Sequence, residues 1–191
     1  MRRAGYLLLA AAALLAPLGA MGASGTTRLI DDPIAWRIVN DGVMGGVSAS
    51  QVSRAGDALR FAGEISLEKN GGFASMRRPF DAAQGAEAAG FLLRVRGDGN
   101  RYRLRVYTRD ATGAENRYSH YATFDTRAGE AMSVELRWPR FAASFRGAVV
   151  AAPPIRFADV VGIGVMITKD DHRQGLGPFA LDLLGIELLQ R

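Results

Sequence analysis

Few residues in this sequence have side chains and neighbours suited to acid–base chemistry. Asp170 and Asp171 precede His172, and such a cluster could act as a general acid and base or bind calcium. Carboxylates in turns, however, more often cap the backbone or face solvent. His120 lies in a predicted strand, where we expect a satisfied, half-buried histidine rather than a metal ligand. These residues predict no catalytic site.

The glycine-rich segments do not complete a nucleophile or phosphate motif. Gly46–Ser50 lacks the final glycine of the G-x-S-x-G turn, and Asp41–Gly46 lacks the lysine and hydroxyl residue of a phosphate-binding loop. The chain has no cysteine and only two histidines, which excludes a thiol nucleophile, a cysteine-ligated zinc and a multi-histidine metal centre. We therefore predict a non-enzymatic protein without a metal or a cofactor.

The composition is that of a folded globular protein. The 191 residues are 48% hydrophobic and 23% charged, which excludes a wholly disordered chain. The net charge is +5, and 22 of the 24 basic residues are arginine. This excess of arginine reflects either codon bias or an anion-binding surface, because arginine binds carboxylate and phosphate in pairs.

The N-terminus has the layout of a secretory signal peptide. Arg2 and Arg3 precede an uncharged run from Tyr6 to Leu18, and small residues near Ala23 suit a cleavage site. The run is shorter than the roughly 20 residues that span a bilayer. We expect a signal peptide over residues 1–23 and a single mature domain over 24–191. The mature protein would be periplasmic or secreted and would not span the membrane, and nucleic acid would not be its partner.

The mature region alternates apolar and polar residues between glycine-rich turns, a pattern typical of strands. Nine or ten strands predict an all-β, jelly-roll β-sandwich. Asn70-Gly71 and Gly97–Asn100 each predict a hairpin turn. Asp81–Ala89 is the best helical candidate. The strands are expected at 58–65, 73–78, 91–96, 101–106, 117–124, 132–138, 144–150, 160–168 and 179–189.

The predicted hairpin around Asp98-Gly99 would carry many arginines on one face. It would place Arg96 opposite Arg101 and Arg94 opposite Arg103, and like charges directly opposed destabilise a strand pair. An acidic neighbour such as Glu135, an anionic ligand or a partner protein would then compensate. The alternative is a solvated face with weak local ion pairs. The candidate arginine face comprises Arg94, Arg96, Arg101, Arg103, Arg105 and Tyr107.

Two specific sequence blocks resemble a known family. These are Val39–Ser48, which contains Asp-Gly-x-Met-Gly-Gly, and Ser66–Arg77, which contains Asn-Gly-Gly-Phe-Ala-Ser. Together with Trp36, Arg96–Gly99 and Phe141–Gly147, they resemble the complex I intermediate-associated protein 30 family. The resemblance implies a galactose-binding-like β-sandwich. Mitochondrial relatives are assembly chaperones of respiratory NADH:ubiquinone oxidoreductase rather than catalytic subunits, and the fold also serves carbohydrate binding.

The two blocks also supply candidate binding loops. The candidates are Asp41, Gly42, Met44, Gly45, Gly46, Asn70, Gly71, Gly72 and Phe73. Their first role is structural, because glycine permits backbone shapes that a Cβ forbids. We expect an exported, non-enzymatic binding module that binds a protein partner, such as an assembly intermediate of a membrane-associated complex. The alternative is a carbohydrate-binding module that uses Tyr107 and Tyr121.

Overall fold

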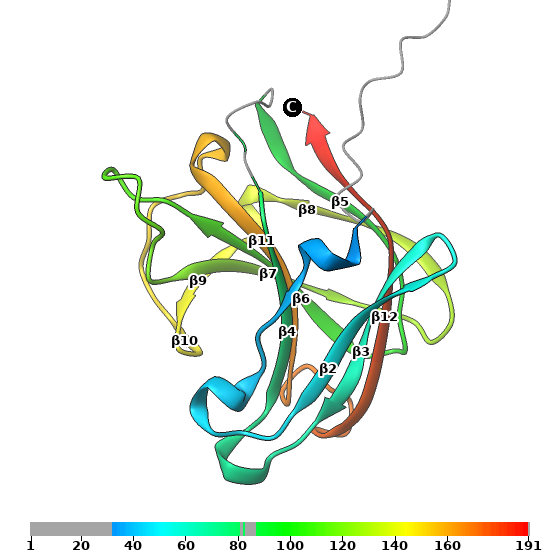
Figure 1. The fold of residues 1–191 in the computed structure, drawn as a ribbon. Coiled ribbons are helices and arrows are strands. Elements are labelled where there is room, and N and C mark those ends of the chain that lie inside the picture. The colour runs from blue at the N-terminus through cyan, green and yellow to red at the C-terminus, as the bar shows by residue number, and fades with distance from the viewer. Residues whose placement is uncertain (1–31, 81, 83–86, 191) are drawn as a thin grey trace, which may run out of the picture.

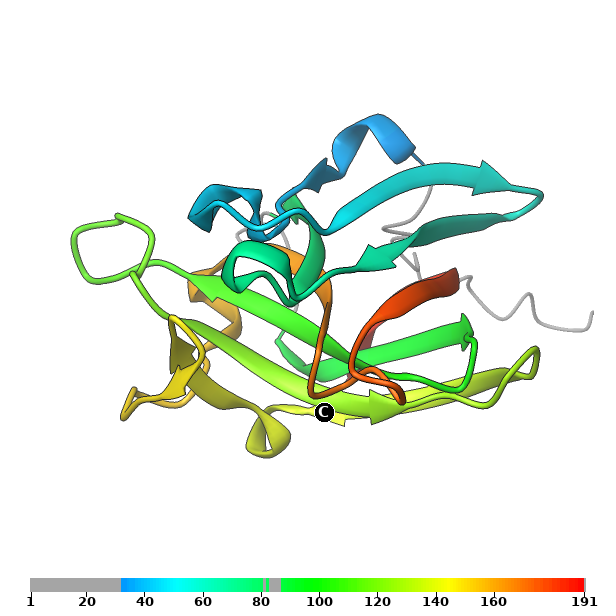
Figure 2. The same cartoon turned by 90° about the horizontal axis from the view of Figure 1, so that it is seen from below.

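The protein is a sandwich of two antiparallel sheets (Figures 1 and 2). The structure, a computed structural model, describes residues 32–80, 82 and 87–190. Within these residues, twelve strands and five short 3₁₀ helices follow one another along the chain. The all-β sandwich is therefore confirmed. The predicted signal peptide, residues 1–23, lies outside the described residues.

One sheet has five strands and the other has seven. The five-stranded sheet has the order β2 (Ala49–Ala55), β3 (Ala58–Ile65), β12 (Gly177–Gln190), β5 (Ala88–Arg96) and β8 (Ala131–Arg137). The seven-stranded sheet has the order β1 (Arg37–Ile38), β4 (Phe73–Pro79), β11 (Val160–Thr168), β6 (Arg101–Thr108), β7 (Ser119–Asp125), β9 (Ala142–Phe145) and β10 (Ala148–Val149). The 3₁₀ helices are η1 (Pro33–Ala35), η2 (Asp41–Met44), η3 (Glu68–Asn70), η4 (Trp138–Arg140) and η5 (Phe157–Asp159).

The core lies between the two sheets and is built by the alternating apolar residues. In β6, Tyr102, Leu104 and Val106 are buried, whereas Arg103 and Arg105 lie on the outer face. The same period of two along the other strands turns one apolar side of each sheet inward. Opposing core residues include Phe61, Leu93, Val95, Leu181 and Leu183 from one sheet and Met76, Leu104, Ile163, Val165 and Ile167 from the other.

Most predicted strands exist, with differences at their ends. The bounds of β3 and β11 agree with the prediction. The strand predicted at 144–150 is divided into β9 and β10, because Arg146 and Gly147 have positive φ values of 51° and 83° and form a turn. Of the predicted helix Asp81–Ala89, residues 81 and 83–86 lie outside the described residues, and Ala88 begins β5.

Both predicted hairpins are wrong. β5 and β6 belong to different sheets, as do β3 and β4, so each turn is a β-arch that carries the chain from one sheet to the other. At the β5–β6 arch, the Asp98 carboxylate accepts hydrogen bonds from Asn100 N (3.0 Å), Tyr102 Oη (3.0 Å) and Ala180 N (2.8 Å). These partners belong to both sheets, so they fix the crossover from one sheet to the other. A hairpin turn exposed to solvent would have no such partners in a second sheet.

The arginine face is consequently divided between two surfaces. Arg94 and Arg96 lie on the five-stranded sheet, and Arg94 pairs with Glu187 at 2.9 Å. Arg101 belongs to the seven-stranded sheet, so the predicted opposition of Arg96 and Arg101 does not exist. Glu135 pairs with Arg137 at 3.2 Å. The like-charge conflict inferred from the hairpin is therefore absent.

Candidate functional site

A buried aspartate joins the two sequence blocks. Asp41 is fully buried, and its carboxylate accepts hydrogen bonds from Ser48 N (3.0 Å), Gly72 N (2.7 Å) and Phe73 N (3.2 Å). The Ser48 hydroxyl donates a further bond. Burial alone would raise the pKa of Asp41, but these four hydrogen bonds outweigh it and lower the pKa. The charged carboxylate therefore connects the loop after β1 to the loop before β4.

The glycines around Asp41 make room for its carboxylate. A Cβ on Gly46 would lie 2.5 Å from Asp41 Cγ, and a Cβ on Gly71 would lie 2.7 Å from Asp41 Oδ2. Gly45 and Gly72 have positive φ values of 91° and 140°, which glycine adopts at little cost. The predicted structural role of glycine therefore fits the geometry at Gly45, Gly46, Gly71 and Gly72, whereas a Cβ on Gly42 would meet no atom within 4 Å.

Three loops meet at one end of the sandwich, at the bottom of Figure 1. Asp41 holds the β1–β2 and β3–β4 loops together, and Lys169 N of the β11–β12 loop donates to Gly72 O at 2.8 Å. All three loops expose large apolar side chains, of which Val43 is 71% and Met44 is 61% exposed. We call this set, Val43, Met44, Val47, Leu67 and Leu176, the apolar rim.

Next to the rim lies a groove of about 300 Å³. The loops contribute Met44, Asn70, Gly71, Gly72, Lys169 and Asp170 to it, and β4 contributes its first residue, Phe73. The seven-stranded sheet contributes Arg103, Arg105, Tyr121, Ser144, Met166 and Thr168, and the β9–β10 turn contributes Arg146 and Gly147. Members of both candidate sets, the loops and the arginine face, therefore line one site.

The groove carries positive charge that the described residues do not neutralise. Arg103 forms a two-pronged ion pair with the buried Asp171, with contacts of 2.6 and 3.1 Å. Arg105 instead donates to the Ser119 hydroxyl at 3.1 Å, and Arg146 packs 5.3 Å from the Phe145 ring centroid. Across residues 32–80, 82 and 87–190, neither Arg105 nor Arg146 has a carboxylate partner within 4 Å. These two cations are available to an acidic ligand.

Other predicted site residues lie away from the groove. Arg101 pairs with Asp125 at 2.9 Å near the beginning of β6, and Arg94 and Arg96 lie on the other sheet. Tyr107 is buried beneath Arg77, whose guanidinium carbon is 3.7 Å from the ring centroid, so it is no exposed sugar platform. Tyr121 does line the groove, with Arg103 5.1 Å above its ring.

Six residues of the groove were not among the sequence candidates: Ser144, Arg146, Gly147, Met166, Thr168 and Lys169. Met166 and Thr168 alternate with the buried residues Val165 and Ile167 of β11. The alternation of side chains along a strand therefore predicts that both residues face outward. Arg146 and Lys169 lie in turns, and only the sheet order brings them beside β6. The first pair could have been found from the sequence, whereas the second required the topology.

In the cluster at 170–172, Asp171 and His172 are held by hydrogen bonds within the fold, whereas Asp170 is exposed and pairs with Lys169 at 3.3 Å. Asp171 accepts from Arg103 and from Thr168 N and Oγ1, at 3.2 and 2.6 Å. His172 Nδ1 accepts from Gln174 N at 3.2 Å, and its Nε2 lies 3.0 Å from Pro178 O. Among the described residues, no group of three or more His, Cys, Asp or Glu is placed to hold a metal ion, and no helix is long and apolar enough to cross a membrane.

The fold is that of known carbohydrate-binding modules. It is similar to the family 11 carbohydrate-binding module of the cellulase Lic26A-Cel5E of Clostridium thermocellum, with a TM-score of 0.62, 11% identity and coverage of 87% of this chain and 95% of that chain. A Clostridium thermocellum family 11 module in complex with a β-1,3-1,4-mixed-linked tetrasaccharide gives a TM-score of 0.62 at 10% identity, covering 86% and 94%. The agarase AgWH50C gives 0.52 at 14% identity, covering 87% of this chain and 25% of that chain.

The family of the chain follows from its sequence blocks and its fold together. The model of the complex I intermediate-associated protein 30 family matches residues 27–183, and the chain belongs to that family. The resemblance noted for the two glycine-rich blocks is thereby confirmed. No curated protein matches the chain.

Proposed function

We propose that this chain is an exported, non-catalytic binding module that binds a protein partner while a membrane-associated complex is assembled or stabilised. The observation that carries the proposal is the apolar rim beside the two cations Arg105 and Arg146. Large exposed apolar side chains gathered on one surface are typical of protein-binding sites. A polar or charged margin around such a patch is the usual anatomy of an interface.

The family supports a protein partner. Its name refers to intermediates of complex I, and the partner proposed for this chain is likewise an incompletely assembled complex. Such a partner exposes apolar surface that the finished complex buries. The rim would cover that surface, and the arginines would orient it through carboxylates, since charge complementarity favours encounter and register.

A glycan is the second candidate ligand of the groove. Tyr121 lines it together with polar groups of Arg105, Ser144 and Thr168, a combination that suits a sugar ring. The fold is shared with a carbohydrate-binding module that was solved with a tetrasaccharide. This candidate uses the groove and leaves the apolar rim unexplained, which is why we place it second.

Affinity capture from the native envelope tests the proposal. The full chain with a C-terminal tag serves as bait in gently solubilised envelope, with Met44→Asp as the test variant. Ile34→Asp is the matched control, because Ile34 is 93% exposed but lies in η1, outside the rim. We expect the wild type and the control to retain a defined membrane complex and Met44→Asp to lose it. Equal retention by all three proteins would contradict the proposal.

A further inference from the structure

Two arginines on the same face of β6 differ in what holds them. Arg103 already has a carboxylate, because the buried Asp171 contacts it at 2.6 and 3.1 Å. Arg105 has instead one hydroxyl, that of Ser119, which its Nε and Nη2 share at 3.1 and 2.5 Å. A guanidinium has five N–H donors and binds a carboxylate best through two parallel hydrogen bonds. Arg105 is therefore poised to bind an external carboxylate, and the exposed Arg146 adds a second positive charge to the groove.

The groove is apolar directly beside Arg105. Arg105 Nη1 lies 3.7 Å from Met166 Sδ, and Met44 and Phe73 also line the groove. A thioether is only a weak acceptor, whereas the flexible methionine side chain adapts well to an apolar ligand. A cation and an apolar wall thus lie within reach of one small group. The volume of about 300 Å³ is at the lower end of small-molecule sites, which suits the end of a chain better than a long segment.

A polypeptide C-terminus supplies both features from one residue. Its carboxylate and its side chain leave the same Cα atom, whereas neighbouring side chains of an extended segment point to opposite faces. An internal aspartate beside an apolar residue would present only one of the two groups to the groove. We infer that the groove binds the C-terminal residue of a protein partner, with the carboxylate on Arg105 and a large apolar side chain against Met166. This inference rests on the proposed function and names the part of the partner that enters the groove.

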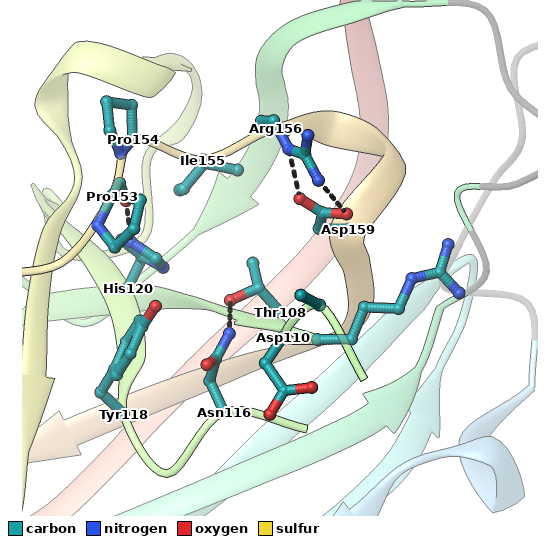
Figure 3. A pocket seen from close by; sticks show the side chains of 12 residues that line it. Thr108, Asp110, Asn116, Tyr118, His120, Pro153, Pro154, Ile155, Arg156 and Asp159 are labelled. Carbon is teal, nitrogen blue, oxygen red and sulfur yellow. Dashed lines mark hydrogen bonds and ion pairs between the residues drawn. The ribbon is translucent and has the colours of Figure 1, made fainter. Parts of the chain in front are cut away.

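A second cavity, shown in Figure 3, lacks the charge for such a ligand. It measures about 480 Å³, opens between the β6–β7 loop and residues 153–159, and shares no lining residue with the groove. Its lining holds two arginines and two aspartates, of which Arg156 and Asp159 pair at 2.6 and 3.0 Å, so the charges cancel. His120 in its wall is only 5% exposed, which corrects the expectation of a half-buried histidine. A carboxylate is therefore attracted to the groove rather than to this cavity.

Methyl NMR of the methionines tests the inference on the full chain. Of the six methionines, Met44 and Met166 line the groove, and Met132 lies in β8 of the other sheet as the internal control. The probe is the hexapeptide acetyl-Gly-Ser-Gly-Ser-Gly-Leu with a free C-terminal carboxylate. It is used at about 10 mM, tenfold above the roughly 1 mM dissociation constant expected for so small a ligand. Three comparison peptides end in leucine amide, end in glycine, or carry Asp-Leu internally between blocked ends.

We expect the probe to shift Met44 and Met166 saturably and to leave Met132 unchanged. Each comparison peptide should bind at least about tenfold more weakly, because it lacks the carboxylate, the apolar side chain or their common Cα. Equal binding of the leucine amide, or equal or stronger binding of the internal Asp-Leu peptide, would overturn the inference. A shift of Met132 as large as that of Met166 would overturn it as well.

Variants of the arginines test which cation holds the carboxylate. Arg105→Gln should abolish the shift, and Arg146→Ser, a change at an exposed turn residue that leaves the sheet intact, should weaken binding several-fold. Arg101→Ser is the matched control, because Arg101 pairs with Asp125 outside the groove. Binding that survives both groove variants, or that Arg101→Ser weakens equally, would show that the carboxylate lies elsewhere and would contradict the inference.

Leu176→Asp separates this inference from the proposed function. Leu176 belongs to the apolar rim but does not line the groove, so this variant should bind the probe normally while losing the membrane complex in affinity capture. If the probe shifts neither groove methionine while capture still depends on the rim, the inference is wrong and the proposed function stands. If the probe binds the groove but capture is independent of the rim, the proposed function is wrong and the C-terminus site stands.

Discussion

At the residue scale, the buried Asp41 explains why the two sequence blocks are rich in glycine. Asp41 accepts four hydrogen bonds from backbone and serine donors, and Gly46 and Gly71 lie where a Cβ would collide with its carboxylate. The Asp-Gly-x-Met-Gly-Gly and Asn-Gly-Gly-Phe-Ala-Ser blocks are thus two halves of one hydrogen-bonded unit. This unit holds Met44 and Phe73 at the groove.

Replacing Asp41 should destabilise the fold strongly. Asp41→Asn keeps the shape but exchanges an acceptor oxygen for an N–H₂ group, which opposes the amide donors of Gly72 and Phe73. We expect a loss of about 2 to 4 kcal/mol in the free energy of unfolding, measured by urea denaturation. The exposed Asp170→Asn should lose less than about 0.5 kcal/mol. Similar losses in both variants would show that the Asp41 carboxylate is unimportant.

The buried His120 makes the fold sensitive to mild acid. Burial lowers the pKa of His120 below 6.5, although its bond to the Pro153 carbonyl opposes the shift. Below pH 6.5 the unfolded chain therefore binds more protons at this residue than the folded chain, and stability falls as the pH falls. We expect the NMR titration midpoint of His120 to lie below 6.5 and the urea midpoint to decrease from pH 7.5 to 5.5. A midpoint at or above 6.5 would refute this.

At the scale of elements, the β5–β6 arch decides which residues share a surface. Asp98 binds donors of β6 and β12, and Tyr102 Oη is one of them. Burial and the nearby Asp98 carboxylate raise the pKa of Tyr102, so its hydroxyl remains protonated and donates. The arch sends Arg103 and Arg105 to the groove and leaves Arg94 and Arg96 on the other sheet.

Removing the Asp98 carboxylate should weaken this arch. Asp98→Ala leaves Tyr102 Oη and Ala180 N without their acceptor, and we expect a loss of about 1 to 3 kcal/mol in urea unfolding. The control is Asp125→Ala, which breaks an exposed ion pair with Arg101 and should cost less than about 1 kcal/mol. Equal costs would mean that Asp98 behaves as an ordinary turn residue, as in a hairpin.

The sequence predicts the strands better than their connections. The alternation of apolar and polar residues locates β3 and β11, because a strand that buries one face needs an apolar side chain at every second position. The edge strand β2 was not predicted, since Val52 is the only large apolar residue in Ala49–Ala55. Asp-Gly and Asn-Gly report a tight backbone turn, but the choice of sheet depends on partners such as Ala180, 82 positions after Asp98. For the same reason, Arg146 and Lys169 could not be placed in the groove beforehand.

At the scale of the molecule, the sandwich gathers three distant loops into one surface. The apolar rim comes from segments near residues 43–47, 67 and 176, and the groove beside it adds cations from β6 and the β9–β10 turn. Neither block of sequence carries this surface alone. The proposed function therefore belongs to the assembled fold.

The charge of the groove should contribute to partner affinity. The double variant Arg105→Ser, Arg146→Ser should weaken capture of the partner about tenfold, because each exposed ion pair contributes about 0.2 to 1 kcal/mol. The wild-type interaction should also weaken with salt, since exposed charges are screened. Arg101→Ser serves as the control, because Arg101 pairs with Asp125 outside the groove. If Arg101→Ser weakened the affinity as much as the double variant of Arg105 and Arg146, that result would contradict this role.

Site-specific photo-cross-linking in the native envelope tests the central claim most directly. The photoreactive residue p-benzoylphenylalanine replaces Leu176 in the apolar rim or, as control, Ile34, and both positions are exposed. The proposed binding surface predicts a defined cross-link from position 176 to one subunit of a membrane complex and none from position 34. Cross-links from position 34 to that same subunit, with none from position 176, would show that the partner binds elsewhere and would contradict the account.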